Sequence, residues 1–377
     1  MSERRKMMKY EKLLFLITVI MFVAAGMIFI SCSGKPAAKF SGKVIKVLTI
    51  NVWSGLDYRG TLKMGEYESP GVRESRYRAL LAQIQEFGPD IIGINEANFL
   101  PDYIDRLAED LGYDCLWHVG VSGLKIWRFG LPSNLREGDA ILARPELGLK
   151  PAGRKQLSGG GFVWNCLSFH TADAIQVLAG RVNAGGEDIY VAVTHLRASP
   201  ENSKRNRQLL LELKGKYGYT DEQYMAALER LERDNSMRLE EAEGLAGFLA
   251  TKVPAGAPVI LMGDFNAEID WPAMKLLSDS GYRDTFKGSA PGYTWDAEKN
   301  LNIRKYYGPG KIGRDPDLYS RLDSHNQMES GRIDFILVND AMSPGALKRS
   351  GVCMDRISEG VHPSDHFGVF AIFQLSD

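Results

Sequence analysis

Polar side chains follow five apolar segments of this chain, and their types are those that hold a cation and a phosphate group. They are Asn51, Glu96, His195, Asp264 with Asn266, and Asp365 with His366. Within Gly263-Asp-Phe-Asn266, the acid and the amide are two residues apart, so an extended backbone places both on one face while Phe265 points into the core. Oxygen ligands of this kind favour magnesium, manganese or calcium over zinc.

A carboxylate inside an apolar segment near the carboxyl terminus is a second indication of chemistry. The sequence Gly331-Arg-Ile-Asp-Phe-Ile-Leu-Val338 predicts a strand, and Asp334 interrupts its apolar run. A buried charge is costly unless a partner receives it. We expect His366 to be that partner, and an ion pair of Asp334 with Arg332 or Arg356 is the alternative.

The elements that would position these residues follow from hydrophobic periodicity. Strands are predicted at residues 44–51, 90–95, 114–119, 140–143, 162–169, 175–182, 189–195, 258–262, 331–338, 352–356 and 369–374. Helices are predicted at 73–87, 103–111 and 271–277, and the charged segment 200–250 is predicted to be helical. Helices are few, and consecutive strands in the middle can pair as hairpins. Two packed sheets with helices outside therefore fit better than a doubly wound parallel sheet.

Composition narrows the class of protein. Hydrophobic residues make up 44% and charged residues 25% of the chain, which is ordinary for a globular protein. The formal net charge is -1, so no overall basic field indicates a nucleic-acid partner. Four cysteines, Cys32, Cys115, Cys166 and Cys353, form no Cys-x-x-Cys pair, which argues against a zinc ribbon or a thioredoxin-type site. We expect the last three to be buried small hydrophobic side chains.

The amino terminus has the pattern of a membrane-directed segment. Basic residues precede an uncharged apolar run from Leu13 to Ile30, and Ser31-Cys32-Ser33-Gly34 follows. This order resembles a bacterial lipoprotein signal in which Cys32 would be lipidated, and an uncleaved spanning anchor is the alternative. In both cases the preceding positive charge places the rest of the chain outside the cytoplasm and tethered to a membrane. The predicted organisation is a signal or anchor at 1–33, a linker at 34–42 and one folded domain at 43–377.

The ordered motifs resemble the endonuclease/exonuclease/phosphatase superfamily, which includes AP endonucleases, deoxyribonuclease-like nucleases, inositol polyphosphate 5-phosphatases and neutral sphingomyelinases. The motifs are Gly263-Asp-Phe-Asn266 and Ser364-Asp-His366, supported by Thr194-His195-Leu196, Gly138-Asp-Ala-Ile141, Arg332-Ile-Asp334 and Tyr293-Thr-Trp-Asp296. The resemblance covers roughly residues 44–373. It implies an α/β fold, a four-layered α/β/β/α sandwich of two mainly antiparallel sheets flanked by helices.

The resemblance also implies a metal site. Glu96 would bind a catalytic magnesium, or manganese or calcium, with Asn51 near it and Asp365 completing the site. A phosphodiester is an anion that repels hydroxide, so a metal and donors must neutralise its charge and a base must generate the nucleophile.

Catalytic roles follow from the same resemblance. Asp264 would position or deprotonate the attacking water, and Asn266 would hold the phosphate. His195 would bind a phosphoryl oxygen or assist the leaving group. His366, oriented by Asp334, would act as general base or contact the phosphate, a task that suits an imidazole whose ordinary pKa is near neutrality.

Two positions depart from the family pattern. The usual Gln before the metal-binding Glu is Asn95 here, and we expect this shorter amide to change the geometry behind the metal ligand slightly without loss of metal binding. Trp53 stands where AP endonucleases have an acid, and an aromatic residue there is more similar to the neutral sphingomyelinase branch. This position favours a phospholipid head group over DNA repair.

Other candidates have plainer interpretations. Asp139 is expected to cap or turn into a strand, and the remaining histidines are given no role. The charged segment Glu201–Arg238 is interpreted as a solvated face, with a lid that touches substrate or membrane as the sharper alternative. Tyr306, Tyr307 and Lys311 belong either to a substrate-selecting loop or to a plain surface loop.

The sequence thus predicts a magnesium-dependent phosphodiesterase that acts on a phosphate ester, either a phospholipid head group or another small phosphodiester. An extracytoplasmic DNA or RNA nuclease is the alternative. A non-catalytic binding protein is the second alternative, because a fold alone does not determine function. We expect a monomer attached to a membrane through its amino terminus.

Overall fold

The computed structural model of the protein describes residues 44–170, 174–288, 292–343 and 345–375. The predicted signal or anchor with Cys32, and the predicted linker, lie outside these residues. Within the described part, none of the helices combines the length and the apolar character that a membrane span requires.

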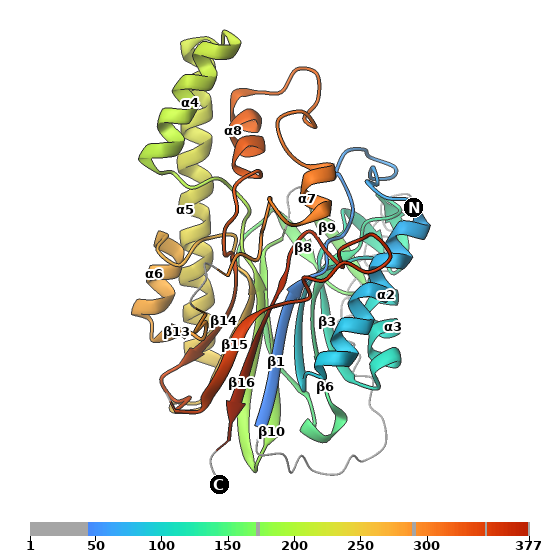
Figure 1. Ribbon diagram of the computed structural model, residues 1–377. Coiled ribbons are helices and arrows are strands. Elements are labelled where there is room, and N and C mark those ends of the chain that lie inside the picture. Colours follow the sequence, from blue (N-terminus) through green and yellow to red (C-terminus); the bar gives the residue numbers. More distant parts are fainter. Residues whose placement is uncertain (1–43, 171–173, 289–291, 344, 376–377) are drawn as a thin grey trace, which may run out of the picture.

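The first sheet has six strands in the order β15-β16-β1-β2-β6-β3 (Figure 1). Only β1 and β2 are parallel neighbours in it, and the other pairs are antiparallel. The strands are β1 (Val44–Asn51), β2 (Ile91–Ala97), β3 (Asp114–Val121), β6 (Glu137–Ala143), β15 (Leu347–Cys353) and β16 (Gly368–Gln374). β6 is buried along its whole length, as expected of a strand that is covered on both faces.

The second sheet has six strands in the order β13-β14-β12-β11-β10-β7. Here β11 and β12 are the parallel pair, and β10 and β11 form the expected antiparallel hairpin. The strands are β7 (Lys150–Gln156), β10 (Gln176–Ala184), β11 (Glu187–His195), β12 (Val259–Asp264), β13 (Tyr282–Asp284) and β14 (Asp334–Asn339).

The two sheets pack face to face, and helices cover their outer faces. A buried cluster between the sheets joins Val47 and Ile141 of the first sheet to Val193 and Met262 of the second. The approach is close at Gly93 of β2, where an added Cβ would lie 2.7 Å from the sulfur of Met262. α2 (Pro70–Phe87) and α3 (Asp102–Leu111) share a second cluster with the first sheet. The predicted four-layered sandwich is confirmed.

The outer face of the second sheet is covered by α6 (Pro272–Asp279) and by the later turns of α5 (Asp221–Lys252), which share a third buried cluster with it. The early turns of α5 extend past the sheet and pack with α4 (Lys204–Tyr217) and α8 (Leu318–Asn326) (Figure 1). Leu210, Leu231 and Leu322 form the centre of this fourth cluster, and each is completely buried. The remaining short helices are α7 (Leu301–Tyr306) and the 3-10 turn η1 (Pro145–Leu147).

A third, smaller sheet was not predicted. It has the order β5-β4-β9-β8 and consists of β4 (Leu124–Ile126), β5 (Phe129–Leu131), β8 (Gly161–Val163) and β9 (Leu167–His170). The single strand predicted at 162–169 is therefore wrong, because the chain turns between Val163 and Leu167 and pairs with itself.

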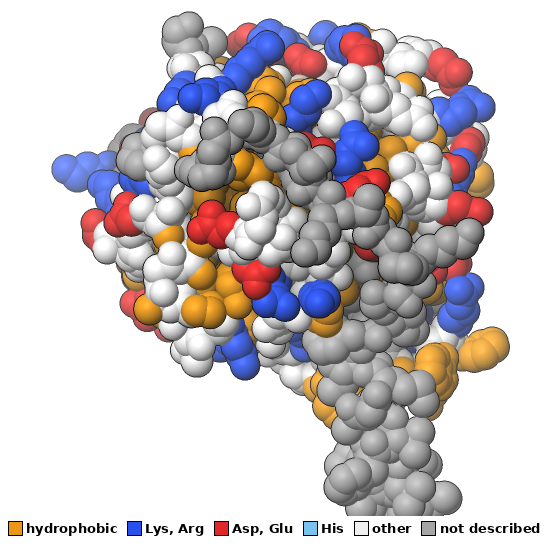
Figure 2. All heavy atoms as spheres, turned by 90° about the horizontal axis from the view of Figure 1, so that it is seen from below, with side chains coloured by type: hydrophobic (Ala, Val, Ile, Leu, Met, Phe, Trp, Pro, Cys, Tyr) orange, Lys and Arg blue, Asp and Glu red, His pale blue; other side chains and the backbone are white. Residues whose placement is uncertain are grey.

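Smaller expectations were also wrong in detail. The strand predicted at 352–356 ends at Cys353 and begins at Leu347. Of the three described cysteines, only Cys115 is buried, while Cys166 and Cys353 are partly exposed. The end of the molecule that Figure 2 shows from below carries Lys and Arg side chains interspersed with Asp and Glu side chains, in keeping with the near-zero net charge.

Candidate active site

The ends of neighbouring strands bring the predicted catalytic residues together. His195 ends β11 and Asp264 ends the parallel strand β12, and the two residues are directly opposite in register. Asp334 begins the antiparallel strand β14 on the other side of Asp264. The three side chains therefore lie at one edge of the second sheet. His195 and Asp264 were predicted at strand ends, whereas Asp334 was predicted inside a strand at 331–338 and instead begins it.

Asn51 connects this edge to the first sheet. Its Nδ2 donates to Oε1 of Glu96 at 2.8 Å and to Oδ2 of Asp264 at 3.1 Å. Its Oδ1 accepts a hydrogen bond from the backbone N–H of Trp53 at 3.0 Å. The amide nitrogen thus faces the two carboxylates, which is the geometry of a residue that positions them, and the role of Asn51 in a metal site stays a prediction.

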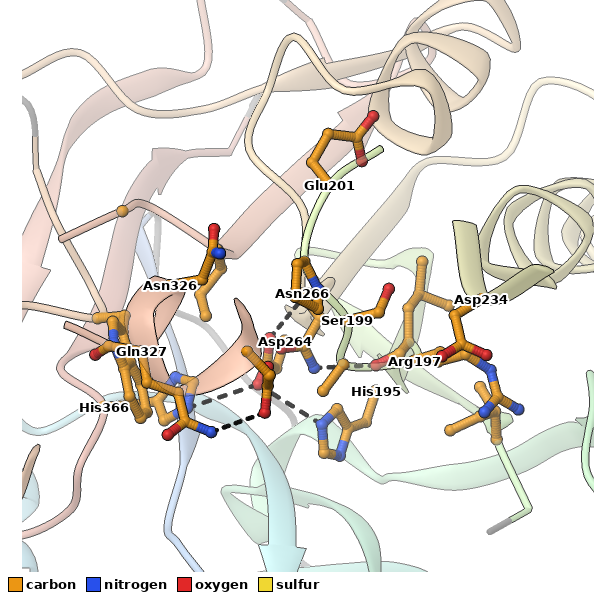
Figure 3. Close-up of a pocket in the computed structure, with 18 of the residues that line it drawn as sticks. His195, Arg197, Ser199, Glu201, Asp234, Asp264, Asn266, Asn326, Gln327 and His366 are labelled. Carbon is orange, nitrogen blue, oxygen red and sulfur yellow. Dashed lines mark hydrogen bonds and ion pairs between the residues drawn. The ribbon is translucent and has the colours of Figure 1, made fainter. Parts of the chain in front are cut away.

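Asp264 is the centre of the site (Figure 3). Its Oδ2 lies 3.6 Å from Nε2 of His195 and 3.7 Å from Nε2 of His366. Burial, followed by the nearby Asp334 carboxylate, raises the pKa of Asp264 to about 6. A carboxylate whose pKa is close to neutrality is suited to accept a proton from water.

His366 contacts Asp334 as predicted, with Nδ1 2.8 Å from Oδ2. Burial opposes a charged imidazole, but the carboxylates of Asp334 and Asp264 outweigh burial and raise the pKa of His366 well above its ordinary value. The ring of Trp295 packs edge-on against that of His366, with centroids 5.1 Å apart. His366 is thereby held as a cation that points at Asp264.

His195 and Asn266 stand on the other side of Asp264 (Figure 3). Burial lowers the pKa of His195, but Asp264 and Glu96 outweigh it and bring the pKa to about 9. The backbone N–H of Asn266 donates to Oδ1 of Asp264 at 2.9 Å, and its Nδ2 donates to the carbonyl of Leu196 at 2.9 Å. Both side chains are donors that border the same cavity.

The carboxylates of Glu96 and Asp365 form the part of the site that fits a cation. Oε2 of Glu96 accepts from the backbone N–H of Ser54 at 3.1 Å, and Oδ2 of Asp365 accepts from the hydroxyl of Tyr307 at 2.7 Å. Burial raises the pKa of Asp365 to about 6, and the charge of Glu96 adds to the rise. Two carboxylates that repel one another in a buried pocket, with only oxygen atoms as donors, match the preference of a hard divalent cation.

A second compact group is less suited to a metal. Ligand atoms of Asp264, Asp334 and His366 lie within 4.8 Å of one another. However, Nδ1 of His366 and Oδ2 of Asp334 already share a hydrogen bond. We therefore assign this group to proton and charge positioning and keep Glu96 and Asp365 as the candidate ligands.

The site opens into a cavity of about 660 Å³. Glu96, His195, Asp264, Asn266, Asp365 and His366 all line it, whereas Asn51 and Asp334 are completely buried behind it. Aromatic side chains of Tyr58, Trp295 and Tyr307 form part of the wall. The cavity thus gathers six of the eight predicted site residues around one space.

Trp53 does not contact this space. It is almost completely buried, packs on Tyr306 with ring centroids 5.3 Å apart, and lies under the guanidinium of Arg76. Tyr307, in contrast, reaches the site and donates to Asp365. Of the two tyrosines in this loop, Tyr307 therefore lines the cavity and Tyr306 packs behind it.

Asp139, which borders the cavity, and Asn95, which is buried behind it, have contacts that the sequence did not indicate. Asp139 was expected at a cap or turn, but it lies within β6, and its carboxylate accepts from Nδ2 of Asn95 at 2.7 Å and from Nε2 of Gln176 at 2.9 Å. Oδ1 of Asn95 in turn accepts from the backbone N–H of Asp264 at 3.0 Å. Asn95, in the position of the usual Gln, thus links both sheets directly behind Glu96.

The charged helical segment borders the cavity as well as solvent. Arg230 and Asp234 of α5 line the cavity, as do Tyr319 and Asp323 of α8. Arg238 was overlooked: it is 2% exposed and donates to the carbonyls of Ser199 at 2.8 Å and Asn266 at 3.0 Å. The interpretation of this segment as a purely solvated face is therefore incomplete.

The comparison with known proteins agrees with this geometry. The Endonuclease/Exonuclease/phosphatase family model matches residues 48–366. TDP2 from D. rerio, solved with a single-strand DNA product, is 16% identical, with 88% of this chain and 98% of that chain covered and a TM-score of 0.51. The human Nocturnin catalytic domain with bound sulfate is 17% identical, with 88% and 94% covered and a TM-score of 0.50.

An endonuclease/exonuclease/phosphatase family protein from Leptotrichia buccalis is 20% identical, with 88% of this chain and all of that chain covered and a TM-score of 0.51. No curated protein matches the chain. At these identities the solved structures establish the shared fold, and the family match extends over most of the chain. The protein belongs to the endonuclease/exonuclease/phosphatase family of phosphoesterases and nucleases.

Proposed function

We propose that this protein is a metal-dependent phosphodiesterase that hydrolyses a phosphate ester by attack of an activated water. The observation that supports this most directly is the position of Oδ2 of Asp264, 3.6 Å from His195 and 3.7 Å from His366, at the floor of the cavity. One carboxylate between two cationic donors provides a proton acceptor for water and positive charge for the phosphate in a single site.

Asp264 is the proposed base. Its pKa of about 6 leaves it mostly ionised at neutral pH and still basic enough to take a proton as water attacks phosphorus. The hydrogen bond from the backbone N–H of Asn266 fixes Oδ1, so Oδ2 is the oxygen that faces the cavity histidines. A positioned base of this kind typically contributes about 100-fold to 10,000-fold to the rate.

Three donors receive the negative charge of the phosphate. His195 and His366 are both held protonated by neighbouring carboxylates, so each is a hydrogen-bond donor at neutral pH. Asn266 uses one of its two amide hydrogens on Leu196 and has the second for a phosphoryl oxygen. Asp334 keeps His366 charged and correctly turned. The arrangement favours His366 as a hydrogen-bond donor to the phosphate and not as the general base.

A divalent cation fits the carboxylates of Glu96 and Asp365, and we propose magnesium. When bound, it supplies a Lewis acid that neutralises phosphate charge and lowers the pKa of water. Asn51 and Ser54 hold the Glu96 carboxylate in place through hydrogen bonds to its two oxygens.

The proposed substrate is a phospholipid head group or another small phosphodiester outside the cytoplasm. The basic and apolar amino-terminal pattern supports attachment to a membrane through Cys32 or through an uncleaved anchor. A monomer is sufficient, because all eight site residues come from one chain. The aromatic residues Tyr58, Trp295 and Tyr307 in the cavity wall are suited to cover the organic part of such a substrate.

A nuclease is the second candidate. The observation in its favour is that TDP2 of D. rerio, which shares the fold, was solved with single-strand DNA. Aromatic side chains in the cavity wall could also stack on bases. The near-zero net charge provides no broad electrostatic attraction for a polyanion.

Activity on a panel of separate substrates tests the proposal. The full chain, purified in detergent, is incubated with magnesium and with bis(p-nitrophenyl) phosphate, sphingomyelin and phosphatidylcholine vesicles, or plasmid DNA. We expect magnesium-dependent hydrolysis of the small diester and of a vesicle lipid. Asp264→Ala should abolish it, while Asp279→Ala on the exposed face of α6 should not.

Two results would contradict the proposal in different ways. Cleavage of DNA alone, lost on Asp264→Ala, would establish the nuclease. Binding of magnesium without turnover of any phosphate ester would establish a non-catalytic protein that retains the fold.

A further inference from the structure

The third sheet presents an apolar outer face that spans all four of its strands. The strand registers place Leu124 of β4 beside Leu131 of β5, and Ile126 beside Phe129. On the other side, Ile126 is beside Leu167 of β9, and Phe169 of β9 is beside Phe162 of β8. The face thus contains two rows, Leu131–Leu124–Phe169–Phe162 and Phe129–Ile126–Leu167–Trp164, with Trp127 at the turn between β4 and β5.

These side chains point into solvent. Phe129 is 83% exposed, Ile126 61%, Trp127 54% and Phe169 53%, and in the two rows only Leu167 is partly buried. The inner face of the same sheet is buried and includes polar residues, since Lys125 and Ser168 are each 1% exposed. A sheet of a soluble protein normally has the opposite arrangement, with apolar residues inside and polar residues outside.

The exposed face is held rigidly. Arg136 is 3% exposed and donates from Nη1 to the carbonyl of Trp127 at 2.6 Å and from Nη2 to the carbonyl of Asn165. It therefore ties together the turns of both hairpins. At the other end of the sheet, Nε2 of His170 accepts from the backbone N–H groups of Ser122 at 2.7 Å and Gly123 at 2.6 Å. The apolar rows therefore belong to a sheet whose two ends are fixed by hydrogen bonds with buried or partly buried side chains.

We propose that the outer face of the third sheet docks on a phospholipid bilayer. Trp and Phe at the tips and Leu and Ile along the rows are the composition that enters the boundary between head groups and acyl chains. Arg128, at the same turn as Trp127, forms an ion pair with Asp102 of α3 at 2.7 Å, so the proposal depends on the apolar side chains. The bilayer is the occupant that the rest of the chain indicates, because the 43 residues before Val44 include the apolar run Leu13–Ile30.

The tether permits this orientation. The chain between Cys32 and Val44 can extend up to about 40 Å. This is longer than β1, which runs along the domain from Val44 for about 26 Å. The domain can therefore turn its third sheet towards the membrane while its amino terminus stays attached.

Docking would place the active-site cavity beside the lipid head groups. β4 begins three residues after Val121, which lines the cavity, and the segment after β5 leads through Arg136 to Glu137, which also lines it. This consequence rests on the proposed function, whereas docking itself does not. It identifies the substrate class as a phosphodiester at the membrane surface.

Tryptophan quenching tests docking independently of activity. The full chain is reconstituted into phosphatidylcholine vesicles whose acyl chains carry bromine, which quenches only nearby indoles. Of its six tryptophans, Trp127 and Trp164 lie on the proposed face. We expect wild-type fluorescence to be quenched and the W127F/W164F variant to lose most of that quenching. The matched control Trp271→Phe, at the residue that precedes α6 and lies outside the third sheet, should keep it.

Equal quenching in wild type and in W127F/W164F would overturn the proposal. A second result would also overturn it: the wild-type protein shows no quenching and forms a dimer in detergent, and Phe129→Glu dissociates that dimer. The face would then be an interface between two copies of the chain. Phe129→Glu changes a side chain that is 83% exposed and should leave the melting temperature unchanged.

Activity provides a second readout. Phe129→Glu should lower hydrolysis of vesicle phospholipid at least about tenfold, because an acid resists insertion among lipids. It should leave hydrolysis of soluble bis(p-nitrophenyl) phosphate unchanged. The control Met225→Glu, which adds the same charge at an exposed apolar position of α5, should affect neither substrate. If no phosphodiester is hydrolysed at all, the proposed function fails and the quenching result still decides docking.

Discussion

Nδ1 of His366, which lines the cavity, lies 2.8 Å from Oδ2 of Asp334, which is completely buried behind it. The carboxylate keeps the imidazole charged and turns its Nε2 towards Asp264. Asp334→Asn keeps the shape but removes the charge, so His366 should lose its cationic form at neutral pH. We expect the turnover number to fall by about 100-fold or more, measured with a soluble diester.

The fold should survive this substitution, since the backbone N–H of Asp334 still donates to Thr294 and β14 is unchanged. Asp279→Asn, an exposed acid on α6, is the matched control and should retain full activity. Wild-type turnover in Asp334→Asn would show that the pair is only structural.

Removal of one candidate metal ligand should separate metal binding from folding. Glu96→Gln keeps the shape and one of the two acceptor oxygens to which Asn51 and Ser54 donate, but removes the charge that a cation requires. Because a ligand that binds only the folded state raises the melting temperature, magnesium should stabilise the wild type. We expect Glu96→Gln to bind magnesium at least about tenfold more weakly, by calorimetry and by the lost thermal shift. The control Glu109→Gln, at an exposed position of α3, should bind magnesium as the wild type does. Unchanged magnesium affinity in Glu96→Gln would show that Glu96 is not a metal ligand.

Much of the fold and the site could be predicted because the sequence pattern indicates where strands end. Apolar runs that stop at a polar residue, as in β12 before Asp264, specify both the strand and the edge where its side chain emerges. The contact of Asp334 with His366 was predictable because a buried charge needs a partner.

Other features depend on tertiary contacts that no local pattern encodes. The segment 162–169 has the apolar content of a buried strand, and periodicity cannot distinguish an apolar row that faces solvent from one that faces a core. Asp139 was misplaced because its partners, Asn95 and Gln176, come from strands far apart in the chain. Arg238 has the spacing of an ordinary charged helix position, and only the fold shows that it is buried.

Arg238 should hold the loop after His195 in place. Besides its bonds to Ser199 and Asn266, it forms a buried ion pair with Glu201 at 2.8 Å and lies over the ring of Trp271. Arg238→Ala would leave the Glu201 carboxylate and several carbonyls without a partner, and we expect the free energy of unfolding to fall by about 3 kcal/mol or more. Denaturant titration measures this. Arg233→Ala, at a position 62% exposed in the same helix, should change stability little.

His118 should make the protein less stable in acid. Nδ1–H donates to the carbonyl of Val119 at 2.7 Å, and burial lowers the pKa of His118 to about 3. The unfolded chain takes up the proton near pH 6.5, so this contribution to stability is complete above pH 6.5 and is lost as the pH falls towards 3. At pH 5 the loss is about 2 kcal/mol.

The prediction is tested with His118→Gln, which should be less stable than wild type at pH 7.5 because packing is disturbed. Between pH 7.5 and pH 5 the free energy of unfolding should nevertheless decrease less in the variant than in the wild type. The difference between the two decreases should be about 2 kcal/mol. Denaturant titrations at both pH values measure the difference. His325→Gln, at a partly exposed position, should show a smaller change, and identical pH dependence in wild type and His118→Gln would contradict the assignment of the acid sensitivity to His118.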